Sequence, residues 1–418
     1  MVAVTENTQA VSIGSLSNLN ACPLAVRAEP DGGYIAYIDF TDLFEPECGQ
    51  LERTFLNLVP KESGGSLDSP GWIGFFGYEF LAEHLGLSLR AKRDLTIPDG
   101  WFGRPKTVIH LHPETTSIQS EIAGRAREIS DLLDQASPGN PSRILRTSQP
   151  IACNLEFDEY KNVFRQAREA ILDGETYQIK ISQRFEAQAE IDPVLAFERL
   201  CLANPAPEAF LLLTENFSIL SCSPETVIEK TGDRITTRPI GGTYQRKARS
   251  SDGSVIESFL KDPKEVAEHN MLVDLERNDL SAICRPGSVA IDRFREVESY
   301  AHLHHLVSTI QGSLKEDLKL PTLLKSMLPG GSITGCPKIR TMEWIDRLEP
   351  CFRGPYTGSF GSISDNGDVR LNLIIRSMLV MQDRCYTQAG GGIVVESTPE
   401  YEFNENKIKA QALLDLLA

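Results

Sequence analysis

The sequence predicts an α+β fold built from large antiparallel sheets. Strand-like segments follow one another in long runs, and few helical segments stand between them. Glycine- and proline-containing turns join many of these segments. This order favours antiparallel sheets over a doubly wound parallel sheet, which needs a helical crossover between most successive strands. The 418 residues are enough for two ordinary domains or one large two-layer domain.

The composition and charge exclude several classes of function. Hydrophobic residues make up 41% and charged residues 24% of the chain, as in globular proteins. The net charge of −16 argues against nucleic acid or an anionic membrane as a partner, and no apolar run reaches the roughly 18–20 residues of a membrane span. The amino terminus lacks a secretory signal pattern, and the nine cysteines show no zinc-binding spacing. We therefore expect a cytoplasmic protein with reduced cysteines.

The first third of the chain is mixed and contains no recognisable catalytic motif. Strand-like patterns occur at 33–40 and 107–112, and a segment rich in glycine and aromatic residues at 71–80 indicates a tightly packed strand or turn. A helix is expected at 121–136. The segment SPGNPS at 137–142 is the best candidate for a linker.

The rest of the chain has stronger periodicity. Alternation of Ile179 and Ile181 with Gln178 and Lys180 predicts a strand with two distinct faces. We expect helices at 158–173, 193–202, 264–280, 322–327, 338–348 and 400–417. We expect strands at 176–189, 207–230 (two or three), 234–245, 299–312, 355–364, 368–381 and 384–397.

The helix predicted at 264–280 carries two carboxylates on the stripe that faces the core. Glu265, Glu268, Leu272 and Leu275 fall at i, i+3, i+7 and i+10, and a stripe with two leucines normally faces inward. Buried like charges repel one another and need a cation or a proton to compensate them. Taken alone, such a pair is more often part of a solvated acidic helix face.

A second stripe near the carboxyl terminus repeats the pattern. Glu402, Glu405 and Lys409 share one face of the last predicted helix with Ala412 and Leu416. Two inward pairs of carboxylates predict a shared hard cation. The simplest choice is Mg2+ with oxygen ligands and some retained waters.

Other features could contact an anionic substrate. Arg376 lies among apolar residues of a predicted strand, so its guanidinium needs a partner, either a substrate carboxylate or a glutamate. The glycines at 390–392 let backbone amides approach a carboxylate closely. His305 lies in a strand-like segment, where a histidine is more often a packing residue than a catalytic one. The segment 329–338 is not a phosphate loop, because Cys336 rather than lysine follows its last glycine.

Six colinear motifs resemble those of the chorismate-utilising enzymes, a family that includes component I of anthranilate synthase and of aminodeoxychorismate synthase, isochorismate synthases and salicylate synthases. The motifs are EHNMLVDLERND, HHLVSTI, GGSITGCPKIRTME, RGPYTGSFG, AGGGIVVESTPEYEFNE and the terminal helix with its two lysines. The resemblance is strong from residue 154 and looser before it, so we divide the chain into an N-terminal region (1–150) and a chorismate-binding catalytic region (151–418). It implies two large antiparallel sheets packed around a cleft with helices outside.

The resemblance also implies roles for individual residues. Mg2+ would be bound by Glu268 and Glu405, with Glu265 and Glu402 close by. His305 would lie beside the ring and the leaving hydroxyl of chorismate, and Thr243 belongs to the implied catalytic set. The residues implied to bind the substrate are Gly241, Gly242, Thr243, Tyr356, Arg376, Gly390, Gly391, Gly392 and Lys409.

Gln178 indicates the nucleophile within this family. It occupies the position at which the water-using branches carry a general-base lysine, and a glutamine cannot usefully deprotonate water. The resemblance therefore implies ammonia, delivered by a separate glutamine amidotransferase subunit, because the chain has no obvious glutaminase motif. Most motifs, including QIKISQRF from Gln178, resemble the aminodeoxychorismate branch, which forms 4-amino-4-deoxychorismate for para-aminobenzoate and folate synthesis.

Gly241 departs from that branch, in which a lysine at this position attacks the ring before ammonia displaces it. Glycine supplies no nucleophile, and the anthranilate branch has a small alanine here. The alternative is 2-amination, giving 2-amino-2-deoxyisochorismate or anthranilate. Lys180 could supply an amine from another direction, although a solvent-facing lysine is the simpler expectation. An alternative of another class is a weakly active chorismate-binding partner subunit.

Overall fold

The structure of the protein is a computed structural model. It describes residues 3–7, 11–29, 31–58, 67, 70–134, 146–147, 151–245, 252–299 and 303–417. The linker predicted at 137–142 lies outside these residues. The division of the chain at residue 150 stays a prediction.

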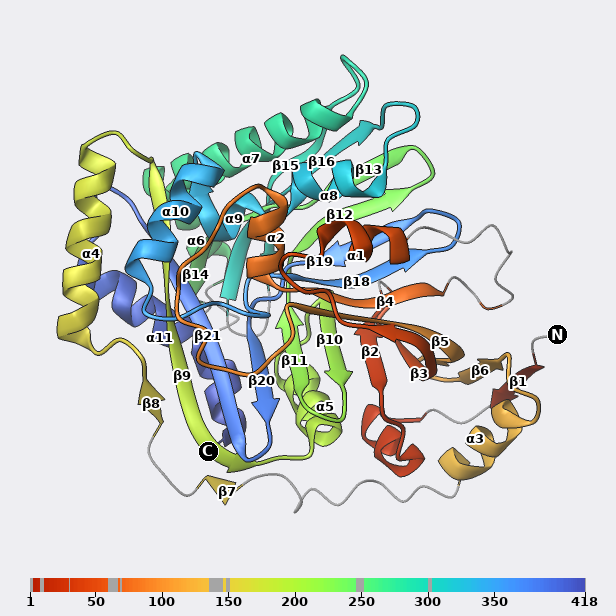
Figure 1. The fold of residues 1–418 in the computed structure, drawn as a ribbon. Helices are drawn as coiled ribbons and strands as arrows, with labels where there is room; N and C mark the ends of the chain where they lie inside the picture. The colour runs from red at the N-terminus through yellow and green to blue at the C-terminus, as the bar shows by residue number, and fades with distance from the viewer. Residues whose placement is uncertain are drawn as a thin grey trace.

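The strands form two antiparallel arrays that share one strand, β5 (Gly100–Leu111) (Figure 1). Most of β5 pairs with β3 (Tyr34–Phe44), whereas its first residues pair with β4 (Gly71–Phe76). The pairings that extend each array are antiparallel as well. The predicted α+β fold with two large antiparallel sheets is confirmed, and β5 joins the two sheets.

The order of the strands brings distant parts of the chain together. Starting from β5, the first array continues through β3, β2 (Leu24–Ala28), β10 (Glu208–Leu213), β11 (Ser218–Ser223), β20 (Ser377–Met381), β21 (Arg384–Ile393) and β9 (Gln178–Glu190). The second continues through β4, β18 (Ser359–Ser364), β19 (Val369–Asn372), β12 (Thr226–Thr231), β13 (Arg234–Thr237) and β16 (Leu303–Ser313), which also pairs with β14 (Ile240–Gln245) and β15 (Ala290–Ser299). Short strands β1 (Ala3–Asn7), β6 (Thr116–Ser120), β7 (Arg146–Thr147), β8 (Ala152–Cys153) and β17 (Gly335–Cys336) extend the edges.

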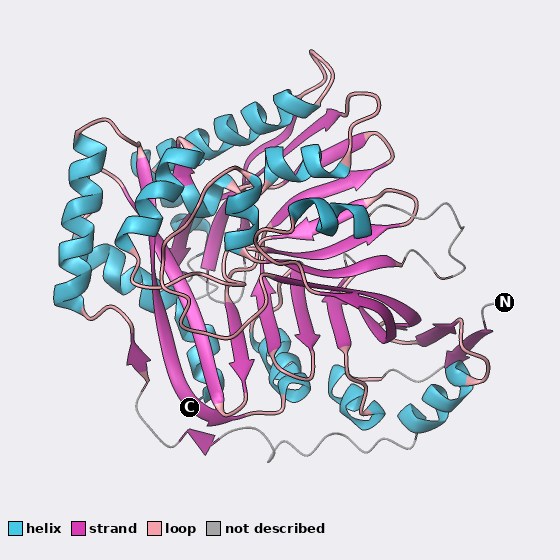
Figure 2. Cartoon of the chain, viewed as in Figure 1, coloured by secondary structure: helices cyan, strands magenta, loops and turns pink. Residues whose placement is uncertain are grey.

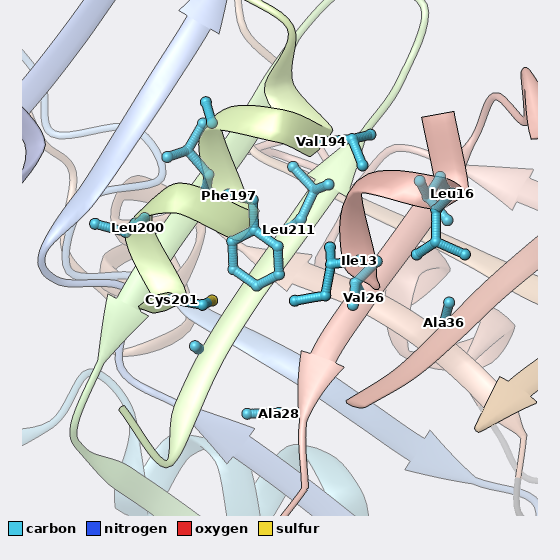
Figure 3. Packing of buried hydrophobic residues seen from close by; sticks show 14 of the residues in the cluster. Ile13, Leu16, Val26, Ala28, Ala36, Val194, Phe197, Leu200, Cys201 and Leu211 are labelled. Atoms are coloured by element: carbon cyan, nitrogen blue, oxygen red, sulfur yellow. The ribbon is translucent and has the colours of Figure 1, made fainter. Parts of the chain in front are cut away.

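Three helices cover the outer face of the first array (Figure 2). They are η1 (Ile13–Leu19), α3 (Arg125–Asp134) and α5 (Pro193–Ala203), and their apolar side chains pack on Val26, Leu211 and neighbouring residues. Figure 3 shows the packing of two of them, η1 and α5, from close by. Asp192 begins α5 by accepting hydrogen bonds from the next two free backbone amides, while Pro193 occupies the first turn, where an N–H is not needed.

A second apolar cluster fills the space between the two arrays. Because side chains alternate along a strand, Phe210 and Leu212 on β10 face this cluster while Leu211 faces the outer helices. The rings of Phe210 and Phe360, which come from different arrays, stack with centroids 4.0 Å apart. This contact ties the two arrays together in the core.

The remaining helices complete the layers. On the second array, α1 (Leu51–Asn57), α2 (Tyr78–His84), α7 (Pro263–Ile283) and α8 (Leu320–Met327) contribute to one apolar cluster. At the β9–β21 end of the first array lie α4 (Phe157–Leu172), α10 (Lys338–Leu348) and α11 (Pro399–Leu414). The chain also forms α6 (Asp252–Lys261), α9 (Gly331–Thr334) and η4 (Asp415–Leu417). No helix in the described ranges is both long and apolar enough to cross a membrane.

Several segments differ from the sequence-based expectation. The sequence did not predict α6 or β15, and 234–245, expected as one strand, forms β13 and β14. Two other predicted segments differ as well. The segment 368–381 is not one strand but two, β19 and β20, because the chain turns at Arg376, whose φ of 47° is incompatible with a continuing strand. The segment 71–80 is a strand only to Phe76, after which α2 begins. In both places the apolar pattern continued across a change of backbone direction.

Replacing Phe210 with alanine should destabilise the protein by about 3–5 kcal/mol, because the fully buried ring spans both arrays and would leave a cavity. The measurement is denaturant unfolding followed by circular dichroism. Leu202→Ala is the control, since Leu202 is 81% exposed and its loss should change stability by no more than about 0.5 kcal/mol. Equal effects of the two substitutions would contradict this account of the core.

Candidate active site

One cavity of about 120 Å3 gathers most of the residues that the sequence singled out. It lies where α7 and α11 face each other across strands of both arrays. The predicted residues that line it are Lys180, Gly241, Gly242, Glu265, Glu268, His305, Tyr356, Arg376, Gly390, Gly392, Glu402, Glu405 and Lys409. Gln178 and Gly391 lie directly behind this lining, in contact with the glutamates. The backbone of Thr243 pairs with His305, and its side chain lies outside the described part of the structure.

The helix α11 presents two carboxylates over Gly391. A Cβ atom at this glycine would lie 2.7 Å from Oε2 of Glu402 and 2.9 Å from Oε2 of Glu405, so both oxygens converge on one point. Ser397 donates a hydrogen bond of 2.7 Å to Glu402, and Lys409 Nζ lies 3.3 Å from Oε1 of Glu405. Burial opposes ionisation of Glu405, but Lys409, Lys180 and a hydrogen bond with Glu402 together lower its pKa below the ordinary value.

The helix α7 brings the second pair of carboxylates to the same cavity. Gln178 Nε2 donates to Oε2 of Glu268 over 3.3 Å, and Oε2 of Glu265 lies 2.6 Å from the position that a Cβ at Gly242 would take. Tyr401 lines the cavity as well. Burial raises the pKa of its phenol, and the negative charges of all four glutamates raise it further. The two acidic stripes predicted from sequence therefore share one electrostatic environment.

The fit of Mg2+ to this site rests on the four carboxylates that line one cavity. Within the described residues, no three acidic, histidine or cysteine side chains stand close enough together to form a ready-made metal cage. Magnesium does not require one, because it is often held by one or two carboxylates together with water and substrate oxygens. Glu268 and Glu405 line one cavity with Glu265 and Glu402, so the carboxylates present supply that minimum.

His305 and Arg376 form a hydrogen-bonded pair in the cavity wall. The guanidinium of Arg376, which can only donate, lies 2.6 Å from Nε2 of His305, and Nδ1 of His305 lies 3.1 Å from the carbonyl oxygen of Gly242. The proton must therefore be on Nδ1. Burial and the adjacent Arg376 hold the pKa of His305 well below its usual range. His305 is thus a neutral ring that orients Arg376.

The glycines of β21 make room for functional side chains. Gly392 lies opposite Lys180 in the sheet, and a Cβ there would come within 2.5 Å of both Lys180 Nζ and Gln178 Nε2. A Cβ at Gly390 would lie 3.1 Å from the hydroxyl of Tyr356. The sequence suggested an approach of backbone amides to an anion, whereas the structure shows that these glycines also open the space in which their neighbours meet.

Gly241 has no space for a side chain. A Cβ at this position would lie 2.6 Å from Nδ1 of His269 and 2.9 Å from its Cα, so part of α7 would have to move. His269 is fully buried, and its Nε2 is 2.7 Å from the hydroxyl of Ser308. A lysine at position 241 is therefore incompatible with the observed packing of β14 on α7.

The sequence analysis missed Glu225. This residue lies in the turn that joins β11 to β12, and its side chain lines the cavity. Its side chain is buried and accepts a hydrogen bond of 2.6 Å from Ser332. Burial raises its pKa to about 8, although the hydroxyl of Ser332, Lys180 and Arg376 work in the opposite direction. No local signal distinguishes this glutamate, because its environment is made by α9, β9 and the turn at Arg376.

Comparison with known proteins assigns the chain to a family. The sequence profile of the chorismate binding enzyme family matches residues 39–415. The chain belongs to this family, and it is a chorismate-utilising enzyme of the anthranilate synthase and aminodeoxychorismate synthase type.

Individual relatives carry both names. Aminodeoxychorismate synthase component 1 of Bacillus subtilis is 33% identical over 82% of this chain and 76% of its own length. Anthranilate synthase component 1 of Arthrobacter globiformis is 41% identical over 82% and 70%. The crystal structure of anthranilate synthase component I from Streptococcus pneumoniae superimposes with a TM-score of 0.78 and 26% identity, covering 98% of this chain and 91% of that one.

His305 should take up a proton only at a pH well below that at which an ordinary histidine titrates, because burial and Arg376 lower its pKa. Nitrogen NMR of histidine-labelled protein should show the proton on Nδ1 at neutral pH, with the signal assigned by its loss in His305→Gln. A titration midpoint near the usual histidine pKa would contradict the hydrogen-bond assignment.

Proposed function

We propose that the protein aminates chorismate at C4 with ammonia, in the manner of an aminodeoxychorismate synthase component I. The observation that carries the choice of ammonia over water is Gln178, whose amide lies against Glu268 behind the cavity lining; the choice of C4 rests on the motifs of the aminodeoxychorismate branch. An amide cannot remove a proton from water, so it suits a nucleophile that already carries a lone pair. The Bacillus subtilis relative of that name supports the same assignment.

The positive and polar groups of the cavity suit a substrate with two carboxylates. Arg376 and Lys409 line it from different elements, and Tyr356 adds a hydroxyl beside Gly390. These groups would hold and orient chorismate. As the resemblance implies, Glu268 and Glu405 would hold Mg2+, with Glu265 and Glu402 beside them. The bound ion would draw negative charge from the ring carboxylate and so ease loss of the allylic hydroxyl.

Glu225 is the proposed proton donor. A carboxyl with a pKa of about 8 is mostly protonated at neutral pH, so it can protonate a departing hydroxyl. In the overall step Glu225 gives its proton to the hydroxyl, the C4–O bond breaks and water leaves, a C4–N bond forms with ammonia, and the proton that the nitrogen then loses restores the carboxyl of Glu225. Ser332, which donates to Glu225, fixes the orientation of the acid.

The missing lysine at position 241 restricts the route. Because a side chain there would collide with His269, no covalent intermediate can form at this residue without rearranging α7. Direct attack by ammonia or participation of Lys180, whose amine lies over Gly392, are the two routes consistent with the geometry. The lack of space for a lysine at position 241 also makes 2-amination the second candidate. The 41% identical Arthrobacter globiformis relative carries the anthranilate synthase name.

The source of ammonia is proposed to be a second subunit. The relatives are named component 1, which points to a partner. Glutamine amidotransfer would release ammonia for the cavity described above. A weakly active, purely supportive subunit is the less favoured alternative. The proposed acid Glu225, the cationic side chains and the four glutamates of α7 and α11 all line one cavity.

Purified protein incubated with chorismate, ammonium and Mg2+ should form 4-amino-4-deoxychorismate, identified by mass and ultraviolet spectrum. Turnover should rise above neutral pH as free ammonia increases, until Glu225 loses its proton near pH 8. Glutamine should support turnover only after a glutaminase is added. Formation of 2-amino-2-deoxyisochorismate or anthranilate alone would refute the choice of C4.

Glu405→Gln should abolish the effect of Mg2+, because it removes one of the two carboxylate charges over Gly391. The first readout is thermal unfolding, in which Mg2+ with chorismate should raise the melting temperature of the native protein but not of the variant. The second is Mg2+-dependent turnover. Glu400→Gln is the control, since Glu400 is exposed on the same helix. Full Mg2+ stabilisation of the Glu405 variant would rule out this metal site.

A further inference from the structure

A buried arginine outside the cavity connects several of its walls. Arg353 follows α10 and forms a two-pronged ion pair with Glu349, with bonds of 2.9 Å from Nε and 2.7 Å from one terminal nitrogen. The same guanidinium donates to the carbonyl oxygens of Lys180 (2.9 Å) and Ile333 (3.2 Å). Its charged carbon lies 5.7 Å from the ring centroid of Tyr356.

Three of these neighbours line the cavity. Lys180 comes from β9, Ile333 from α9 and Tyr356 from the turn that precedes β18. One side chain therefore sets the spacing between three elements that are far apart in the sequence. Arg353 is 4% exposed, and in such a dry environment a bidentate pair with good geometry holds its partners tightly.

The position of Arg353 is in turn set by Glu79, which belongs to the N-terminal third of the chain. The backbone N–H of Arg353 donates to Oε1 of Glu79 over 2.8 Å, and that of Gly354 donates to Oε2 over 2.9 Å. In the reverse direction, Tyr78 N–H donates to the carbonyl oxygen of Gly354 over 2.8 Å. The turn is thus clamped to the first residues of α2 by three hydrogen bonds.

The clamp is buried and has little freedom to adjust. Glu79 is 6% exposed, and Gly354 adopts the left-handed conformation that lets its amide and carbonyl face α2 together. The ring of Tyr78 packs against the guanidinium of Arg353, whose charged carbon is 4.8 Å from the ring centroid. The strand β4 leads into α2, and it pairs with β18, which begins just after the turn. The helix that carries Glu79 and the turn that carries Arg353 are therefore each attached to one of two paired strands.

We propose that Glu79 is a positioning residue for the substrate-binding wall of the active site, acting through Arg353 on Tyr356 and on β9. This inference rests on the proposed function only for the identity of the substrate. Glu79 touches none of the cavity. Its effect is to hold the turn from which Tyr356 projects, so it should influence the binding of chorismate and leave the carboxylates of α7 and α11 in place.

The ionised form of Glu79 is the one that fits the clamp. Two carboxylate oxygens accept the two backbone N–H groups, whereas a protonated carboxyl would direct a donor at one of them. Burial raises the pKa of Glu79 to about 7, while the two amides and Arg93 work in the opposite direction. The charged groups nearest the clamp are Arg93, Arg353 and Glu349. Glutamine at this position imitates the protonated state at every pH.

The test compares Glu79→Gln with Glu83→Gln. Glu83 lies on the same helix and also accepts a backbone amide, that of Gly49 at 2.8 Å, but it does not line the cavity. Amide hydrogen exchange over residues 352–358 should quicken about tenfold in the Glu79 variant, the size expected for one lost buried hydrogen bond. The chorismate KM should rise by a similar factor, while the Mg2+ concentration for half-maximal activity stays unchanged. The Glu83 variant should match the native protein in amide exchange, in chorismate KM and in the Mg2+ concentration for half-maximal activity.

Two results would overturn the proposal. One is exchange and KM in the Glu79 variant equal to those of the Glu83 variant. The other is a parallel loss of Mg2+ affinity, which would indicate general destabilisation. If the native protein does not turn over chorismate, the proposed function fails, but the exchange experiment still tests the clamp. If Glu79→Gln does not fold, Glu79→Asp, whose shorter carboxylate cannot reach both amides, should give the same selective pattern.

Discussion

The candidate active site depends on holding four carboxyl groups in one cavity. Two carboxylates come from α7 and two from α11, and their mutual repulsion opposes the fold unless other groups compensate it. Lys409 and Lys180 offset part of this charge, and Gln178 and Ser397 donate hydrogen bonds to it. The compensation is shared among several elements, so the acidic pairs, the strand β9 and the glycine run must be understood as one unit.

Backbone geometry allows this convergence. The helix α11 can approach β21 closely because Gly391 has no side chain where the two carboxylates meet, and Gly392 leaves space for Lys180. Gly241 allows the corresponding approach of β14 to His269 on α7. The two sheets therefore hold α7 and α11 close to the strands β14 and β21. The absence of Cβ atoms at the glycines of these strands allows this close approach.

Charge and burial separate the remaining groups by function. Burial and the negative charge of Glu276 raise the pKa of Glu225 to about 8, so it is largely protonated at neutral pH, whereas Lys409 and Lys180 help to lower the pKa of Glu405 below its ordinary value. His305 is neutral because it is buried against Arg376. Among the described residues of the N-terminal third, none lines the cavity, yet Glu79 holds the turn that carries Tyr356. One wall is thus organised by a part of the chain in which the sequence showed no chemistry.

The sequence alone determined the antiparallel α+β class, the two acidic helices and the glycine-rich strand, because periodic side chains and missing side chains are local properties. The inward stripes of Glu265 and Glu402 follow from helical spacing, and both are confirmed as cavity residues. The roles of Arg376 and Glu225 depended on the tertiary structure. Arg376 itself adopts the left-handed conformation that interrupts the predicted strand. Glu225 is buried by elements that are distant in the sequence, among them the one that carries Ser332. Local periodicity encodes neither a change of backbone direction nor the burial of a single side chain by distant elements.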